Sequence, residues 1–118
     1  MGYNSFEDLD VWKRACRLAV EIYESLRKCK DYGLKDQMTR SVVSIASNIA
    51  EGAERNSGTE YIRFLHIAKG SAAELRTQVY IAQQIGIYKS SKAFEFINEL
   101  KEISAMLQGL IKSLSSKT

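Results

Sequence analysis

Apolar residues recur at intervals of three and four positions through four long segments of this 118-residue chain, and short polar stretches separate the segments. Such spacing places the apolar side chains on one face of an α-helix. In the last segment the pattern continues over six successive intervals. The chain has no proline, which would interrupt a helix, and no alternating runs of the kind that form strands. The sequence therefore predicts an all-α fold.

Turn signals mark where the helices end. Asp31–Gly33 and the polar stretch 54–58 interrupt the apolar pattern, and Gly86 follows the third periodic segment. Gly33 and Gly86 suit the left-handed residue that closes many helices. We expect helices at about residues 8–29, 34–53, 58–85 and 91–114. Because the connections are short, these helices are expected to form an antiparallel up-down-up-down four-helix bundle, a single domain over residues 1–118.

The first helix carries two apolar stripes side by side, which is more than one core face of a monomer needs. We assign the wider stripe to the core. The narrower stripe has two interpretations, deep burial within the bundle or packing against another copy of the protein. The wider stripe comprises Leu9, Trp12, Cys16, Ala19, Val20, Tyr23 and Leu26. The narrower stripe comprises Val11, Ala15, Leu18 and Ile22.

Each of the other helices offers one main core stripe. In the second helix the stripe is Met38, Val42, Ile45, Ile49 and Ala53. In the third it is Tyr61, Phe64, Leu65, Ala68, Ala72, Leu75, Val79 and Ala82. In the fourth it is Phe94, Ile97, Leu100, Ile103, Leu107, Leu110 and Leu114. Gly70 lies mid-helix, where Gly costs about 1 kcal/mol relative to Ala, so we expect another backbone to approach it closely.

Polar residues follow the core stripes of the second and third helices. Asn48, Glu51 and Glu74 are the residues that stand out, and a buried carboxylate needs a partner. Arg40 and Arg76 are the candidate partners. We interpret the five residues as a hydrogen-bonded layer that fixes helix register or a subunit interface. The rival interpretation is an acid–base or metal site on the two glutamates, which lacks an accompanying histidine or glycine-rich loop.

The chain lacks the usual signatures of an enzyme. His66 is the only histidine, and there is no nucleophile elbow, phosphate-binding loop or dinucleotide-binding loop. Cys16 and Cys29 lie thirteen positions apart, which is not a metal-ligand spacing. We expect no catalytic site, cofactor or metal. No stretch is apolar enough to span a membrane, and Met1–Asp10 lacks a signal-peptide pattern, so we expect a cytoplasmic protein with no membrane partner.

The second and third helices contain two distinctive runs, Arg-Ser-Val-Val-Ser-Ile-Ala-Ser-Asn-Ile-Ala-Glu-Gly at 40–52 and Ala-Lys-Gly-Ser-Ala-Ala-Glu-Leu at 68–75. These runs resemble the bacterial four-helix-bundle protein family of 23S rRNA intervening sequences. Phe-Glu-Asp-Leu-Asp-Val-Trp at 6–12 resembles the family's opening motif, and Ile85–Tyr88 resembles the family's turn before the last helix. The resemblance implies a homopentamer. It also implies a relation to the accessory protein of diversity-generating retroelements, which binds nucleic acid and a reverse transcriptase.

The formal net charge is +3, from 17 Lys and Arg against 14 Asp and Glu, and this small excess favours anionic partners. Together with the resemblance, it predicts a non-enzymatic homo-oligomer that binds RNA or DNA through its phosphates, without reading sequence. The candidate contacts are Lys13, Arg14, Arg17, Arg55, Arg63 and Lys69. The alternative is a protein-interaction scaffold or accessory subunit without nucleic-acid contact, which uses the spare apolar stripe of the first or last helix.

Overall fold

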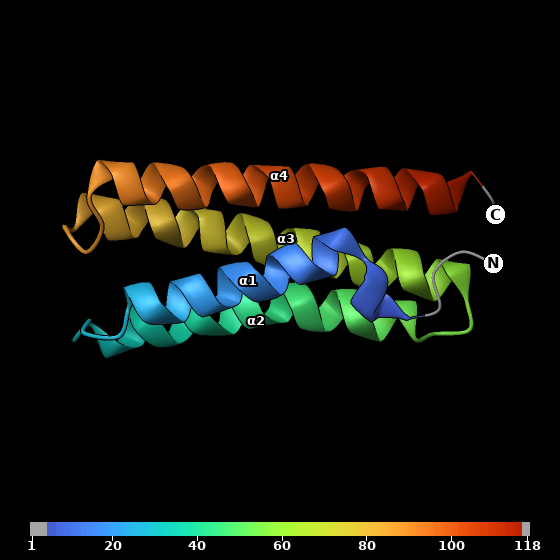
Figure 1. Ribbon diagram of the computed structural model, residues 1–118, viewed down its shortest axis with the longest axis horizontal. Coiled ribbons are helices and arrows are strands. Elements are labelled where there is room, and N and C mark those ends of the chain that lie inside the picture. Colours follow the sequence, from blue (N-terminus) through green and yellow to red (C-terminus); the bar gives the residue numbers. More distant parts are fainter. Residues whose placement is uncertain (1–4, 117–118) are drawn as a thin grey trace.

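The computed structural model describes residues 5–116, and a short 3-10 helix at Phe6–Asp8 precedes four α-helices. The helices are α1 (Asp10–Ser25), α2 (Tyr32–Ala53), α3 (Gly58–Gln84) and α4 (Ser90–Ser115). They run alternately in opposite directions along a molecule that measures 46 × 20 × 19 Å (Figure 1). The predicted all-α four-helix bundle is confirmed.

Each helix packs against its neighbours in sequence, and α1 also contacts α4. The contact between α2 and α3 is the most extensive of these, whereas the contact between α1 and α4 is much smaller. In Figure 1, α1 and α2 form the lower pair of helices and α3 and α4 the upper pair. The two pairs therefore present outer faces on opposite sides of the bundle.

The core of α1 uses the narrower of its two apolar stripes, so our assignment of the wider stripe was wrong. Val11, Ala15, Leu18 and Ile22 are buried, and Leu26, a member of the wider stripe that lies just beyond the helix, is buried with them. In the wider stripe, by contrast, Val20 is 58% exposed and Tyr23 is 51% exposed. The two stripes adjoin and are both apolar, so helical periodicity alone does not decide which of them faces the bundle axis.

The core face of α4 also differs from the prediction at its ends. Phe94 is 65% exposed, whereas Phe96 is buried at 3%. Near the other end Ile111 is buried, while Leu110 and Leu114 are only partly buried against the core. The buried face of α4 is thus rotated relative to the predicted stripe, because α4 packs against both α3 and α1 rather than against one neighbour.

The helix ends show why two turn signals had different outcomes. Asp31 Oδ1 accepts a hydrogen bond from the Leu34 N–H at 3.1 Å, so α2 begins at Tyr32 and Gly33 lies inside its first turn. The predicted left-handed Gly33 was therefore wrong. Gly86 has a φ of 86° and closes α3 as predicted. The Ile87 N–H reaches the Ala82 carbonyl at 2.8 Å, as in a Schellman cap.

Two helical glycines have opposite environments. A Cβ built on Gly52 would lie 2.7 Å from Phe64 Cβ and 3.2 Å from the Tyr61 carbonyl oxygen, so α2 and α3 approach closely there. A Cβ on Gly70 would meet nothing within 4 Å. Our expectation of a close backbone approach at Gly70 was therefore wrong within the single chain, and the close approach belongs to Gly52 instead.

Candidate nucleic-acid interface

The three predicted contacts on α1 have different environments. Arg14 reaches across to α4, where its Nε and Nη2 donate to the two carboxylate oxygens of Glu99 at 2.9 and 2.6 Å. This carboxylate raises the pKa of Arg14 above its ordinary value. Arg14 therefore links α1 to α4, two helices that otherwise make few contacts with each other. Lys13 and Arg17 are exposed, and within residues 5–116 they make no ion pair.

Arg55 and Arg63 lie together where α2 and α3 meet. Their guanidinium groups lie over the ring of Phe64, 4.7 and 4.6 Å from its centroid. Each also has a carboxylate partner, Glu51 at 3.3 Å from Arg55 and Glu60 at 3.0 Å from Arg63. A hydrogen bond from Arg63 lowers the pKa of Glu60. This corner is therefore close to electrically neutral.

Lys69, the sixth predicted contact, lies on another side of the bundle. Its Nζ donates to Gln108 Oε1 on α4 at 2.6 Å. The structure thus brings Arg55 and Arg63 together but leaves the α1 residues and Lys69 elsewhere. The six residues do not form one continuous basic surface.

The predicted polar layer is present only around Asn48. Its Nδ2 donates to the Ser44 carbonyl at 2.8 Å and to Ser44 Oγ at 2.9 Å. Ser44 Oγ in turn lies 2.9 Å from Ser71 Oγ, which links α2 to α3. Seven residues after Ser71 in α3, Gln78 is also buried, and within residues 5–116 its Oε1 has no hydrogen-bond partner. Ser44, Ser71 and Gln78 are among the polar residues beside the core stripes, but sequence reasoning did not single them out.

The charged members of the predicted layer lie toward solvent and do not pair as expected. Arg40 binds Asp36 at 2.9 Å, four residues earlier in the same helix. Glu51 pairs with Arg55, and Glu74 and Arg40 line one hollow of about 260 Å³ between α2 and α3. Arg76 is half-buried and makes no ion pair in the described part of the chain. Because the glutamates are exposed, burial imposes no requirement for a partner.

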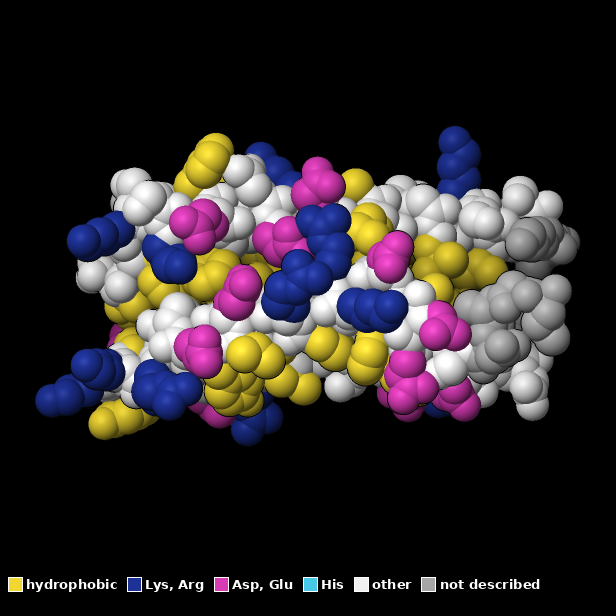
Figure 2. All heavy atoms as spheres, in the orientation of Figure 1, with side chains coloured by type: hydrophobic (Ala, Val, Ile, Leu, Met, Phe, Trp, Pro, Cys, Tyr) yellow, Lys and Arg dark blue, Asp and Glu magenta, His cyan; other side chains and the backbone are white. Residues whose placement is uncertain are grey.

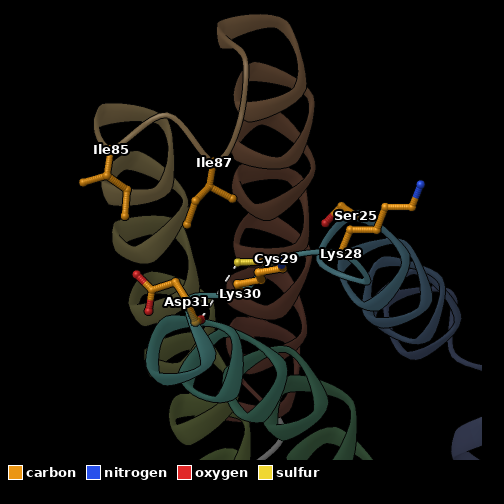
Figure 3. Close-up of a pocket in the computed structure, with 7 residues that line it drawn as sticks. All are labelled: Ser25, Lys28, Cys29, Lys30, Asp31, Ile85 and Ile87. Atoms are coloured by element: carbon orange, nitrogen blue, oxygen red, sulfur yellow. Dashed lines mark hydrogen bonds between the residues drawn. The ribbon is translucent and has the colours of Figure 1, made fainter.

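One feature that sequence reasoning missed is a hollow at the end of the bundle, between the α1–α2 and α3–α4 loops. It has a volume of about 480 Å³. Its lining comprises Ser25, Lys28, Cys29, Lys30, Asp31, Ile85 and Ile87 (Figure 3). Ser25 Oγ lies 2.6 Å from the Tyr88 hydroxyl, a hydrogen bond that joins the end of α1 to the α3–α4 loop. Burial raises the pKa of Tyr88 above its ordinary value of 10.

The described residues offer little for metal or nucleophilic chemistry. In residues 5–116, no three His, Cys, Asp or Glu side chains converge as metal ligands would. His66 is exposed on α3, away from the core. Burial raises the pKa of the Cys16 thiol, which makes the reactive thiolate scarcer. None of the helices in this range is long and apolar enough to cross a membrane.

Known proteins show the same fold and the same sequence pattern. A crystal structure of a protein of unknown function from the S23 ribosomal protein family, from Bacteroides thetaiotaomicron, matches with a TM-score of 0.82. The two sequences are 26% identical, over 86% of this chain and 98% of the other. No curated protein matches the chain. Residues 7–109 match the model of the 23S rRNA-intervening sequence protein family. The chain therefore belongs to the family of 23S rRNA-intervening sequence proteins.

Proposed function

We propose that this protein is a non-enzymatic, cytoplasmic homo-oligomer that forms a ring, a pentamer as the family resemblance implies, and binds nucleic acid through basic surface residues. The observation that supports this assembly is a pair of exposed apolar faces on opposite sides of the bundle. Soluble monomers rarely expose large contiguous apolar patches, so such faces mark interaction sites.

The first of these, the α1–α2 face, consists of Val20, Tyr23 and Val43. Tyr23 and Val43 line the same surface hollow, and all three side chains are at least 42% exposed. The second, the α3–α4 face, consists of Tyr80 and Phe94, which also line a common hollow. Yellow side chains on the lower side of Figure 2 lie over the α1–α2 pair.

The relation between the two faces favours a ring over a dimer. A two-fold dimer buries the same patch on both copies, whereas a contact between two different patches repeats from copy to copy. The α1–α2 face of one copy can pack on the α3–α4 face of the next. Such head-to-tail contacts close into a ring when the rotation per copy divides a full turn.

The assembly is tested by multi-angle light scattering coupled to size exclusion. We expect the wild-type mass to be about five times that of the 13.3 kDa chain. Tyr23→Lys places a charge in the α1–α2 face and is expected to give single chains. Asn56→Lys, in the loop between α2 and α3, introduces the same charge outside both faces and should leave the mass unchanged. A wild-type protein that remains a single chain at high concentration would contradict the assembly and favour a scaffold for a foreign protein.

Nucleic-acid binding is supported by the excess of positive charge and by the exposed Lys13 and Arg17, which have no ion-pair partner among the described residues. Fluorescence anisotropy with a structured RNA and a duplex DNA, titrated across salt, measures this function. We expect the logarithm of the association constant to fall linearly with the logarithm of salt concentration, because bound phosphates release counterions. Absence of binding to either probe at low salt would remove this function.

A further inference from the structure

The charges of the bundle are divided along its long axis. One end of the bundle is formed by the α1–α2 and α3–α4 loops and by the first residues of the helices that follow them. We call residues 26–36 and 85–92 the basic end. It carries two acidic residues, Asp31 and Asp36. Its basic residues are Arg27, Lys28, Lys30, Lys35, Lys89 and Lys92. At the opposite end, acidic residues outnumber basic ones: Glu7, Asp8, Asp10, Glu51, Glu54 and Glu60 against Arg55, Arg63 and Lys112. Dark-blue side chains accordingly gather at the left end of Figure 2.

Most of the lysines at the basic end are uncompensated. Within residues 5–116, Lys28, Lys30 and Lys89 make no ion pair, and Lys35 makes only a 3.5 Å hydrogen bond to a backbone carbonyl. Arg27 and Lys92 are the exceptions, and their partners are Glu24 at 3.9 Å and Glu95 at 3.5 Å.

The two acids of the basic end are already engaged. Asp31 caps the start of α2, and Asp36 pairs with Arg40 at 2.9 Å. Four of the six contacts predicted from sequence are likewise occupied, because Arg14, Arg55 and Arg63 bind carboxylates and Lys69 binds Gln108. Among the described residues, the largest group of cations without an ion-pair partner therefore lies at the basic end.

The hollow between the two loops lies at this basic end, and two of its lysines are among the residues that line the hollow. Lys28 and Lys30 come from one loop, and Ile85 and Ile87 from the other. In Figure 3, Ile87 points toward Cys29, while the Lys28 side chain extends away from the hollow, toward solvent. The isoleucines offer no hydrogen-bonding groups that could read base edges, and lysines contact phosphates as point charges.

From these observations we infer that the basic end is the surface on which the phosphodiester backbone of a nucleic acid docks. Lys28, Lys30, Lys35 and Lys89 contact phosphates from the two loops, and the hollow accommodates part of the backbone between them. This inference rests on the proposed nucleic-acid binding and assigns it to a surface other than the one predicted from sequence. Contacts of this kind do not distinguish sequences.

The test removes one lysine from each loop. In the Lys28→Gln/Lys89→Gln variant, we expect the affinity for a labelled RNA hairpin and a labelled DNA duplex at low salt to fall by about tenfold or more. The slope of the salt dependence should fall by about 1 for each lysine that contacts a phosphate. The matched control is Lys101→Gln/Lys112→Gln, which loses the same charge from exposed positions elsewhere and should bind within about twofold of wild type. Because all four residues are exposed, thermal melts should show both variants to be folded.

Three other outcomes overturn the inference, and each points to a different cause. If Lys13→Gln/Arg17→Gln abolishes binding while the basic-end variant binds normally, the nucleic acid lies on α1, and the proposed function survives without this surface. If the control variant loses as much affinity as the basic-end variant, binding is diffuse and no docking surface exists. If the wild-type protein binds neither probe at low salt, both the inference and the proposed function fail. A loss with one probe only supports the surface and identifies RNA or DNA as the partner.

Discussion

Replacing Phe96 with Ala is expected to lower the free energy of unfolding by about 3–5 kcal/mol. Phe96 is 3% exposed, and its ring lies against that of Tyr88 with the centroids 5.4 Å apart. Removing the ring takes apolar surface out of the core and leaves a cavity that the surrounding side chains fill only partly. Urea denaturation followed by circular dichroism measures the change.

The matched control for this prediction is Phe94→Ala, two residues earlier in the same helix. The Phe94 ring is 65% exposed, so its loss should change the unfolding free energy by less than about 1 kcal/mol. Both variants are best compared in the Tyr23→Lys background, where subunit association does not contribute. Similar losses at the two positions, or a larger loss at Phe94, would show that the buried face of α4 has been misassigned.

Gly52→Ala is expected to destabilise the protein by about 1–3 kcal/mol, although Ala is the better helix former. The added Cβ would lie 2.7 Å from Phe64 Cβ and 3.2 Å from the Tyr61 carbonyl oxygen. Neither atom is the flexible end of a side chain, so α2 and α3 must move apart beside their connecting loop. The denaturation midpoint should therefore fall, with little change in its slope.

Gly70→Ala is expected to change the stability in the opposite direction from Gly52→Ala. Nothing lies within 4 Å of the added Cβ, so the substitution should stabilise α3 by about 1 kcal/mol through helix propensity alone. A neutral Gly52→Ala would argue against the close approach of α2 and α3. A destabilising Gly70→Ala would mean that another chain covers this part of α3.

The accuracy of the predicted core depended on what lies beside each apolar stripe. In α2, polar and small residues flank the stripe, and Met38, Val42, Ile45 and Ile49 are all fully buried as predicted. In α1 a second apolar stripe adjoins the first, so two rotations of the helix bury similar amounts of apolar surface. The contacts with α2 and α4 select the rotation that buries Leu18 and Ile22 and exposes Val20 and Tyr23.

The candidate interface was harder to predict than the fold, because the state of a surface charge depends on residues distant in sequence. Arg14 and Glu99 are 85 positions apart, and nothing local to either indicates that they pair across α1 and α4. Lys28 and Lys89 belong to different loops, so neither loop alone contains a dense basic cluster. Once the helices run alternately in opposite directions, both loops fall at the same end.

By itself the sequence determined the number of helices, their approximate bounds and the closure of α3 at Gly86, because helical periodicity and capping are local properties of the chain. The tertiary structure alone decided which stripe of α1 is buried, where α2 and α3 touch at Gly52, and which cations remain without a partner. These features depend on how helices rotate and pack against one another, and that packing joins residues that no local pattern connects.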